Sequence, residues 1–286
     1  MKQSIEPCYN PTEEELNMMF FILFSLLVIS FLLYKARKNT TDININHIDL
    51  TDSNLKDSFS ILHLSDLHME NISLTPNELA QKLENKPIDL IALTGDFLDR
   101  KKSIPKLIPY LKVLQNINPR YGMYAVLGNH DYVLKKPSLE KLIDVLGQHN
   151  CPVLQNESRT ISVDGKNINI IGIDDYSTNH SDIAQAYKKV QPGKNIVLTH
   201  DPNIVLEMEN YSFDYLMAGH FHGGQICYPK AFHLIKMGKL PRKNIIKGLH
   251  RMHNASFYIS EGLGQTGVNI RIGSRPEIAF HKLSIS

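Results

Sequence analysis

The sequence is poor in cysteine and carries little net charge. Its three cysteines, an odd number, are scattered over 286 residues, and no C-x-x-C pair occurs; they are Cys8, Cys151 and Cys227. This pattern argues against a disulfide framework. The formal net charge is +2, so the chain as a whole is not a polyelectrolyte. No internal repeat or low-complexity segment is visible, and residues 59–286 suffice for one large domain with a sizeable core.

One long uncharged run interrupts this composition. After a polar N-terminal tail (residues 1–15), residues 16–34 are almost entirely apolar, and Met18 to Tyr34 contains no charge. As a helix this stretch of 17 residues is about 25 Å long, at the short end of a membrane span. The apolar residues surround the helix without a 3.6-residue period, which disfavours a buried core helix. We interpret residues 16–34 as a transmembrane anchor.

A cleaved signal peptide is the alternative interpretation of this run. Its n-region should be basic, but only Lys2 is, and no small-x-small cleavage site follows. The chain continues instead with Lys35-Ala36-Arg37-Lys38, and no twin-arginine export signal is present. The positive-inside rule then predicts a single-pass protein of the inner (cytoplasmic) membrane, with the C-terminal domain facing the cytoplasm.

The remaining sequence predicts a tether and an α/β domain. Residues 35–58 are polar after the basic cluster and predict a juxtamembrane tether. Thr75-Pro76-Asn77-Glu78 predicts a capped helix, apolar stripes predict helices over 104–117 and 137–146, and Pro202 begins another. Asp164-Gly165 predicts a β-hairpin. Strands alternating with helices in both halves favour two mixed sheets with helices outside.

Polar motifs follow five of the predicted strands, each at the strand end. The central motif is Gly128-Asn129-His130-Asp131, in which Asp131 is expected to orient the His130 imidazole. The other candidate ligands of a metal site follow four further apolar runs; they are Asp66, His68, Asp96, His200, His220 and His222. Together with Asn129 they form a mixed oxygen and nitrogen set, which suits Mn, Fe or Zn better than Mg or Ca.

This ordered set of motifs resembles the calcineurin-like metallophosphoesterase superfamily, from about Ser60 to the C-terminus. The resemblance implies a four-layer αββα sandwich with two divalent metal ions at the strand ends. It assigns one ion to Asp66, His68, Asp96 and His222, and the other to Asp96, Asn129, His200 and His220. Asp96 then bridges the two ions. It further implies that bound water is activated as the nucleophile, with Mn²⁺ the expected ion, and that His130 protonates the leaving group.

Two further stretches concern the substrate. Residues 229–255 combine seven basic residues with interleaved apolar ones and contain no acid. They are either a solvated loop or a flap that meets an anionic amphiphile or an anionic leaflet; Arg242 and Lys243 are the candidate contacts here. Arg271 and Arg275, with glycine-rich turns at 223–224 and 262–267, resemble the membrane-associated bacterial branch that includes chlamydial-type UDP-2,3-diacylglucosamine pyrophosphatases of lipid A synthesis. Either arginine is a candidate phosphate ligand.

These patterns predict a membrane-anchored hydrolase of a phosphodiester or pyrophosphate bond. Its expected substrate carries phosphate and a lipid, and nucleic acid is not expected because of the membrane anchor. The alternatives are a general phosphodiesterase or phosphatase and a non-catalytic scaffold. A complete ligand set favours an enzyme over a scaffold.

Overall fold

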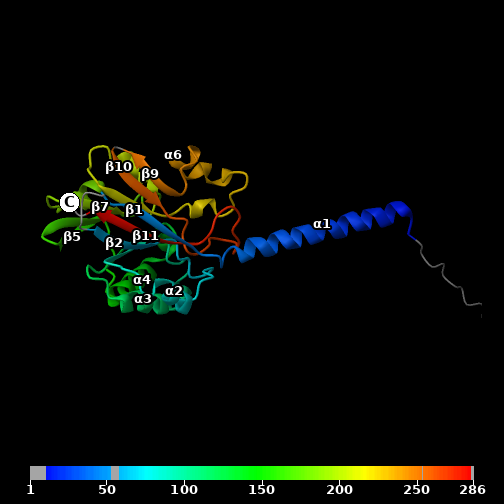
Figure 1. Ribbon diagram of the computed structural model, residues 1–286, viewed down its shortest axis with the longest axis horizontal. Coiled ribbons are helices and arrows are strands. Elements are labelled where there is room, and N and C mark those ends of the chain that lie inside the picture. The colour runs from blue at the N-terminus through cyan, green and yellow to red at the C-terminus, as the bar shows by residue number, and fades with distance from the viewer. Residues whose placement is uncertain (1–10, 53–57, 253, 285–286) are drawn as a thin grey trace, which may run out of the picture.

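Two mixed β-sheets form the centre of the protein (Figure 1). The computed structural model describes residues 11–52, 58–252 and 254–284. The first sheet has the strand order β1 (Asn44–Leu50), β11 (Glu277–Ser284), β2 (Ser58–Leu64), β3 (Leu90–Thr94) and β4 (Met123–Val126). The second has the order β5 (Glu157–Val163), β6 (Lys166–Gly172), β7 (Lys194–Leu198), β8 (Tyr215–Ala218), β10 (Ala255–Ile259) and β9 (Gly248–Met252).

Both sheets are buried on their two faces. Along β2, Phe59 and Ile61 pack between the sheets, whereas Leu62 and Leu64 pack against helices. Neighbouring residues of a strand point to opposite faces, so this near-continuous apolar run supplies two cores at once. Three apolar cores, one between the sheets and one outside each, therefore separate four layers. The αββα sandwich expected from the sequence is confirmed.

Helices cover the outer faces. Figure 1 shows α2 (Pro76–Leu83), α3 (Ile104–Ile117) and α4 (Lys136–Gln148) together on the first sheet. The second sheet is covered by α5 (Ile183–Tyr187), α6 (Lys239–Arg242) and the 3-10 helices η3 (Pro202–Glu207) and η5 (Phe232–Met237). Shorter 3-10 helices are η1 (Lys101–Ser103), η2 (Asp131–Val133) and η4 (His222–Gly224). The predicted capping box is present: the Glu78 amide donates to Thr75 Oγ1, and the Thr75 amide donates to the Glu78 carboxylate at 2.7 Å.

The first helix, α1 (Glu13–Lys38), projects away from the sandwich (Figure 1). It begins at a capping box between Thr12 and Glu15 and so includes the end of the polar tail, of which residues 1–10 lie outside the described structure. Its most apolar 18-residue window has a mean hydropathy of 2.5 and no buried residue, and the helix is long enough to cross a membrane. An exposed helix of this kind is not a core helix, which excludes that alternative.

The prediction of a tether over residues 35–58 was wrong for residues 35–38 and 44–50, which form regular structure. The helix continues to Lys38, and β1 pairs in parallel with β11 from Asn44 to Leu50. Asn46, Ile48 and Leu50 are partly buried and alternate with exposed residues, as in a half-buried edge strand, which needs only one partner strand and one packed face. The many polar residues between them obscured this pattern. Residues 53–57 lie outside the described structure.

The end of α1 is bonded to the sandwich. The Arg271 amide donates to the carbonyl oxygen of Ala36 at 2.9 Å, and the Asn39 side-chain amide donates to the Arg271 carbonyl oxygen at 2.8 Å. Ala36 is the one buried residue of α1. Thr40 also shares a hydrogen bond of 2.8 Å with the Ser73 hydroxyl. The helix therefore has a fixed docking point on the domain and is not joined to it through a flexible linker.

Candidate metal centre

The polar motifs converge where strands of the two sheets end. Asp66 and His68 follow β2, Asp96 follows β3, and His200 and His220 follow β7 and β8. Since β2 to β4 are mutually parallel, as are β7 and β8, the carboxyl ends within each set meet at one sheet edge. Five of the seven candidate ligands have a positive φ, namely Asp66, His68, Asp96, His220 and His222. Such backbone strain collects at functional sites.

One group of side chains surrounds Asp66 and His222. His222 Nε2 lies 3.3 Å from Asp66 Oδ1 and 3.2 Å from His68 Nε2. His68 Nε2 is 3.6 Å from Asp96 Oδ2. All four residues are buried.

A second group surrounds the other side of Asp96. His200 Nε2 lies 3.1 Å from Asp96 Oδ2, and His220 Nδ1 lies 3.1 Å from His200 Nε2. The side-chain oxygen of Asn129 is buried and has no hydrogen-bond partner among the described residues. Asp96 thus belongs to both groups, as a bridging carboxylate would.

The donor set fits divalent cations. Two pairs of imidazole nitrogens face each other at 3.1–3.2 Å beside buried carboxylates, an arrangement that needs a proton or cation between them. His200 Nδ1 donates to the Thr94 carbonyl oxygen at 2.7 Å, and His68 Nδ1 donates to Asp99 at 3.1 Å. These bonds turn the Nε2 atom of each ring towards the site.

Burial sets the protonation of these ligands. It lowers the pKa of His220 to about 3 and that of His222 well below its ordinary value. Both imidazoles are therefore neutral, as metal ligands must be. Burial works in the opposite direction on Asp96, but His200 and His68 hold the pKa of that carboxyl well below its usual range. Asp96 therefore remains an anion, as a ligand shared by two cations must.

Two glycines make room for the carboxylates. A Cβ on Gly128 would overlap Asp96 Oδ1, and one on Gly219 would overlap the side chains of Ser65 and Asp66. The glycines in the Gly128 and Gly219 motifs are therefore needed for close approach, beyond their role in turning the chain.

His130 is held by a residue that the sequence analysis missed. Its Nδ1 lies 3.0 Å from Asp99 Oδ1, and its backbone amide donates to Asp96 Oδ1 at 2.8 Å. Burial alone would lower the pKa of His130, but the hydrogen bond to Asp99 and the charge of Asp96 raise it to about 9. The imidazole is therefore protonated at neutral pH. The signal for this residue was the sequence Gly95-Asp96-Phe97-Leu98-Asp99, whose second aspartate lies three residues after a ligand.

The expectation that Asp131 orients His130 was wrong. Asp131 is fully buried, and its carboxylate accepts hydrogen bonds from the amides of Phe97 (2.9 Å), Leu98 (3.3 Å) and Gly128 (3.0 Å). It begins the 3-10 helix η2, and its side chain turns back under the Gly128 loop. Its observed role is to join the loops after β3 and β4.

Arg271 is not available to bind a phosphate, contrary to expectation. It is fully buried, and its guanidinium donates to five carbonyl oxygens at 2.7–3.2 Å, those of His222, Glu261, Arg275, Gly262 and Gly264. A fixed planar donor suits several loop carbonyls at once. Because the Arg271 amide also bonds Ala36, this residue connects the end of α1 to the loop that carries His222.

The other three predicted substrate contacts lie outside the two ligand groups. Arg275 Nε donates to Asp42 at 3.0 Å, near the end of α1. Arg242 is exposed and donates to the Ile235 carbonyl oxygen at 3.2 Å, and Lys243 is exposed beside it. Lys247, also in the basic stretch, pairs with Glu261 at 3.1 Å.

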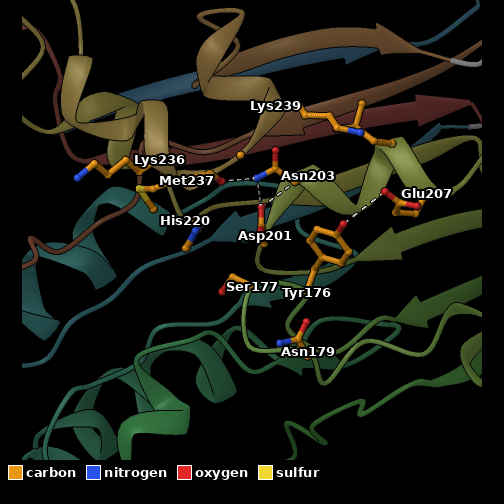
Figure 2. A pocket seen from close by; sticks show the side chains of 12 residues that line it. Tyr176, Ser177, Asn179, Asp201, Asn203, Glu207, His220, Lys236, Met237 and Lys239 are labelled. Carbon is orange, nitrogen blue, oxygen red and sulfur yellow. Dashed lines mark hydrogen bonds between the residues drawn. The ribbon is translucent and has the colours of Figure 1, made fainter.

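Two other lysines of the basic stretch border a cavity that reaches the candidate metal centre. The cavity has a volume of about 620 Å³ and is lined by His220, Lys236 and Lys239, with Tyr176 and Asn179 opposite (Figure 2). The Asn203 side-chain amide donates to the Met237 carbonyl oxygen at 2.8 Å and so holds the segment in place. The C-terminal part of residues 229–255 is not a flap, since β9 pairs with β10.

Comparisons with known proteins agree with this geometry. The family model of the calcineurin-like phosphoesterases matches residues 59–224. The uncharacterized metallophosphoesterase YkoQ of Bacillus subtilis is 56% identical over 93% of this chain and 100% of its own length. The UDP-2,3-diacylglucosamine pyrophosphatase LpxG of Chlamydia trachomatis is 26% identical over 85% of this chain and 90% of its own. Phosphodiesterase YaeI of Escherichia coli is 26% identical over 79% and 82%. The chain belongs to the calcineurin-like phosphoesterase family of metal-dependent hydrolases.

Proposed function

We propose that this protein is a membrane-anchored hydrolase with two metal ions that cleaves a phosphodiester or pyrophosphate bond of a lipid-linked substrate. The observation that carries the proposal is the convergence of six of the seven candidate ligands beside His130, in a domain bonded directly to an apolar helix. A lipid-linked nucleotide such as UDP-2,3-diacylglucosamine, in lipid A biosynthesis, is the substrate we favour. Similarity to the pyrophosphatase LpxG supports it.

One ion would be held by Asp66, His68, Asp96 and His222, and the other by Asp96, Asn129, His200 and His220. When bound, two such ions supply an activated water and neutralise charge on the phosphoryl group. Manganese is the favoured metal, with iron or zinc as alternatives, because the donors are mixed imidazole nitrogens and oxygens.

His130 would act on the leaving group. A protonated imidazole can give its Nε2 proton to the departing oxygen while Asp99 accepts a hydrogen bond from Nδ1. The same donor stabilises negative charge that develops in the transition state. His130 is about 29% exposed at its side chain, so it can reach a bound substrate.

The substrate's anionic part would lie in the cavity that is lined by His220, Lys236 and Lys239. Cationic lysines at this place attract a second phosphate or a nucleotide diphosphate. Arg242, Lys243 and Arg275 lie farther along the same basic surface or near the α1 junction, and we assign them to contact with the membrane rather than with phosphate.

The helix α1 would cross the inner (cytoplasmic) membrane once. Its last turn carries Lys35, Arg37 and Lys38, whereas its first turn carries three glutamates. The basic residues in the last turn support a cytoplasmic location for the hydrolase domain, because the positive-inside rule keeps such flanks in the cytoplasm. A signal peptide would instead release the domain on the far side, and the size of the mature chain distinguishes the two.

Activity of the metal-reconstituted full chain against a substrate panel tests the function. The panel contains UDP-diacylglucosamine, bis-p-nitrophenyl phosphate, a phosphopeptide and single-stranded DNA. We expect the lipid-linked pyrophosphate to be hydrolysed with the highest kcat/KM. Preference for the small diester would identify a general phosphodiesterase, and absence of any turnover in metal-loaded protein would support a scaffold.

A further inference from the structure

Exposed apolar side chains outside α1 gather in two loops. Among the described residues after α1, eight large apolar side chains are exposed, and five of these lie in residues 225–238 and 262–276. They are Ile226, Tyr228, Phe232, Ile235 and Val268, with Tyr228 82% exposed and Val268 63% exposed. Single exposed apolar residues need no explanation, but a group of them marks an interaction surface.

The two loops are joined to each other and to the end of α1. The Cys227 amide donates to the Ile272 carbonyl oxygen at 2.7 Å, and the Ile272 amide donates to the Gln225 carbonyl oxygen at 2.8 Å. The preceding residue, Arg271, donates its amide hydrogen to the carbonyl oxygen of Ala36. Ala36 follows the apolar run by only two residues, which is about 3 Å along a helix. The loops therefore lie at the level where α1 would leave a membrane.

A groove lies between the last turns of α1 and these loops. It has a volume of about 650 Å³ and is lined by Leu32, Lys35, Ala36 and Asn39 from the helix and by Ile226, Tyr228, Ile272, Gly273 and Arg275 from the loops. Its walls are largely apolar. Arg275 is already paired with Asp42, whereas Lys35 is exposed and has no carboxylate within 4.0 Å among the described residues. The groove thus offers apolar walls and a cationic rim.

The surroundings of the groove carry the same sign of charge. Arg37 and Lys38 lie one turn or less from Lys35, and Lys230 lies two residues from both Tyr228 and Phe232 in the neighbouring loop. Basic side chains next to exposed apolar ones are the arrangement that binds an anionic membrane surface. A protein partner would need complementary acidic groups, but it would also have to compete with the lipid that already surrounds Leu32.

We propose that the groove binds one anionic glycerophospholipid of the leaflet from which α1 emerges. One acyl chain lies against Leu32, Ile226 and Ile272, and Lys35 contacts the phosphate of the headgroup. Tyr228 and Phe232 enter the same leaflet beside it. The inference rests on α1 crossing a membrane and not on the hydrolase activity, because the lipid is a fixed structural ligand and not the substrate.

The absence of tryptophan from the chain allows a direct test of the surface. Tyr228→Trp in the full chain, reconstituted in nanodiscs of phosphatidylcholine and phosphatidylglycerol, provides a single fluorophore. We expect lipids with brominated acyl chains to quench it by half or more. Leu249→Trp, at a 43% exposed position on the edge strand β9, is the control and should lose less than a tenth of its emission. Equal, weak quenching at both positions would overturn the membrane contact.

Lipid retention tests the groove itself. Native mass spectrometry of the full chain, released from nanodiscs containing phosphatidylglycerol, should detect one retained phosphatidylglycerol per chain. Ile226→Glu places a carboxylate in the groove and should reduce this occupancy at least fivefold, whereas Leu249→Glu, matched in exposure (41% and 43%), should not. Equal retention by the two variants, or equal retention of phosphatidylcholine and phosphatidylglycerol by the wild type, would contradict the proposal. Asp96→Asn should retain the lipid, and its loss there would identify the lipid as substrate.

Discussion

The Nδ1 atom of His130 lies 3.0 Å from Oδ1 of Asp99, and the same carboxylate oxygen lies 3.1 Å from His68 Nδ1. One aspartate thus orients a candidate metal ligand and the proposed proton donor together. Since both bonds are to Nδ1, both Nε2 atoms remain free of Asp99, and His68 Nε2 lies 3.6 Å from Asp96 Oδ2 in the centre. Asp99 therefore determines the direction of two imidazoles without itself reaching the centre.

Asp99→Asn should shift the pH dependence of turnover. The protonated form of His130 is the active one, so the rate falls as pH rises through the His130 pKa, which is about 9 with Asp99 present. Removing that hydrogen-bonded carboxylate lowers the pKa and moves the alkaline limb of kcat to lower pH. We also expect kcat at neutral pH to fall about 10- to 100-fold. Asp131→Asn is the control and should lower the melting temperature without moving that limb; an unmoved limb in Asp99→Asn would disprove the assignment.

His130→Ala should retain bound metal but slow hydrolysis by about 10²- to 10⁴-fold, the usual contribution of a positioned acid. A substrate whose leaving group has a low pKa needs less protonation and should recover much of the rate. Metal content by mass spectrometry and kcat for a series of aryl phosphodiesters measure the two effects. Equal losses across the series would exclude proton donation to the leaving group.

Arg271→Lys should weaken metal binding although Arg271 is not expected to touch a metal ion. Lysine has only three N–H donors and cannot replace the five hydrogen bonds of the Arg271 guanidinium, so the loop carrying His222 loses part of its support. We expect faster release of metal to a chelator, by about tenfold, and a lower melting temperature. Arg275→Lys is the matched control, because a partly exposed pair with Asp42 contributes little. Similar release rates for the two variants would argue against this supporting role.

Charge reversal at lysines that line the cavity should raise KM more than charge reversal at basic residues outside the cavity. Lys236→Glu with Lys239→Glu places two carboxylates in the cavity that His220 also lines, so KM for an anionic nucleotide substrate should rise at least tenfold with folding unchanged. Arg242→Glu with Lys243→Glu changes the charge equally but lies outside the residues that line the cavity. An equal rise in KM for both double variants would mean that the charge acts only at long range.

The candidate ligands were predictable from the sequence because each follows an apolar strand, and parallel strands bring their ends together. Asp99, the hydrogen-bond partner of His130, was not predictable in this way. Asp96 has a φ of 53°, and this left-handed turn redirects the following loop so that Asp99 and not Asp131 reaches the imidazole. Sequence spacing does not reveal such a turn at a residue other than glycine. Arg271 was misassigned for a similar reason, since its five acceptors are backbone carbonyl oxygens, which any sequence supplies.

The fold was predictable in its layers but not at the end of α1. A capping box identified α2, apolar stripes identified α3 and α4, and apolar runs identified most strands. The role of residues 39–50 depends on long-range contacts, such as Asn39 with Arg271 across the chain and β1 with β11. Such contacts leave only a weak pattern in the local sequence. The polar residues 39–50 were therefore interpreted as part of a tether.

The metal content of the purified full chain tests the central claim most directly. Inductively coupled plasma mass spectrometry after manganese reconstitution should find two ions per chain in the wild type and fewer than one in Asp96→Asn, since that residue is the only carboxylate shared by both ligand groups among the described residues. Hydrolysis should fall in parallel by at least 10³-fold, because both ions are needed. Wild-type turnover together with two bound ions in Asp96→Asn would contradict the dinuclear site.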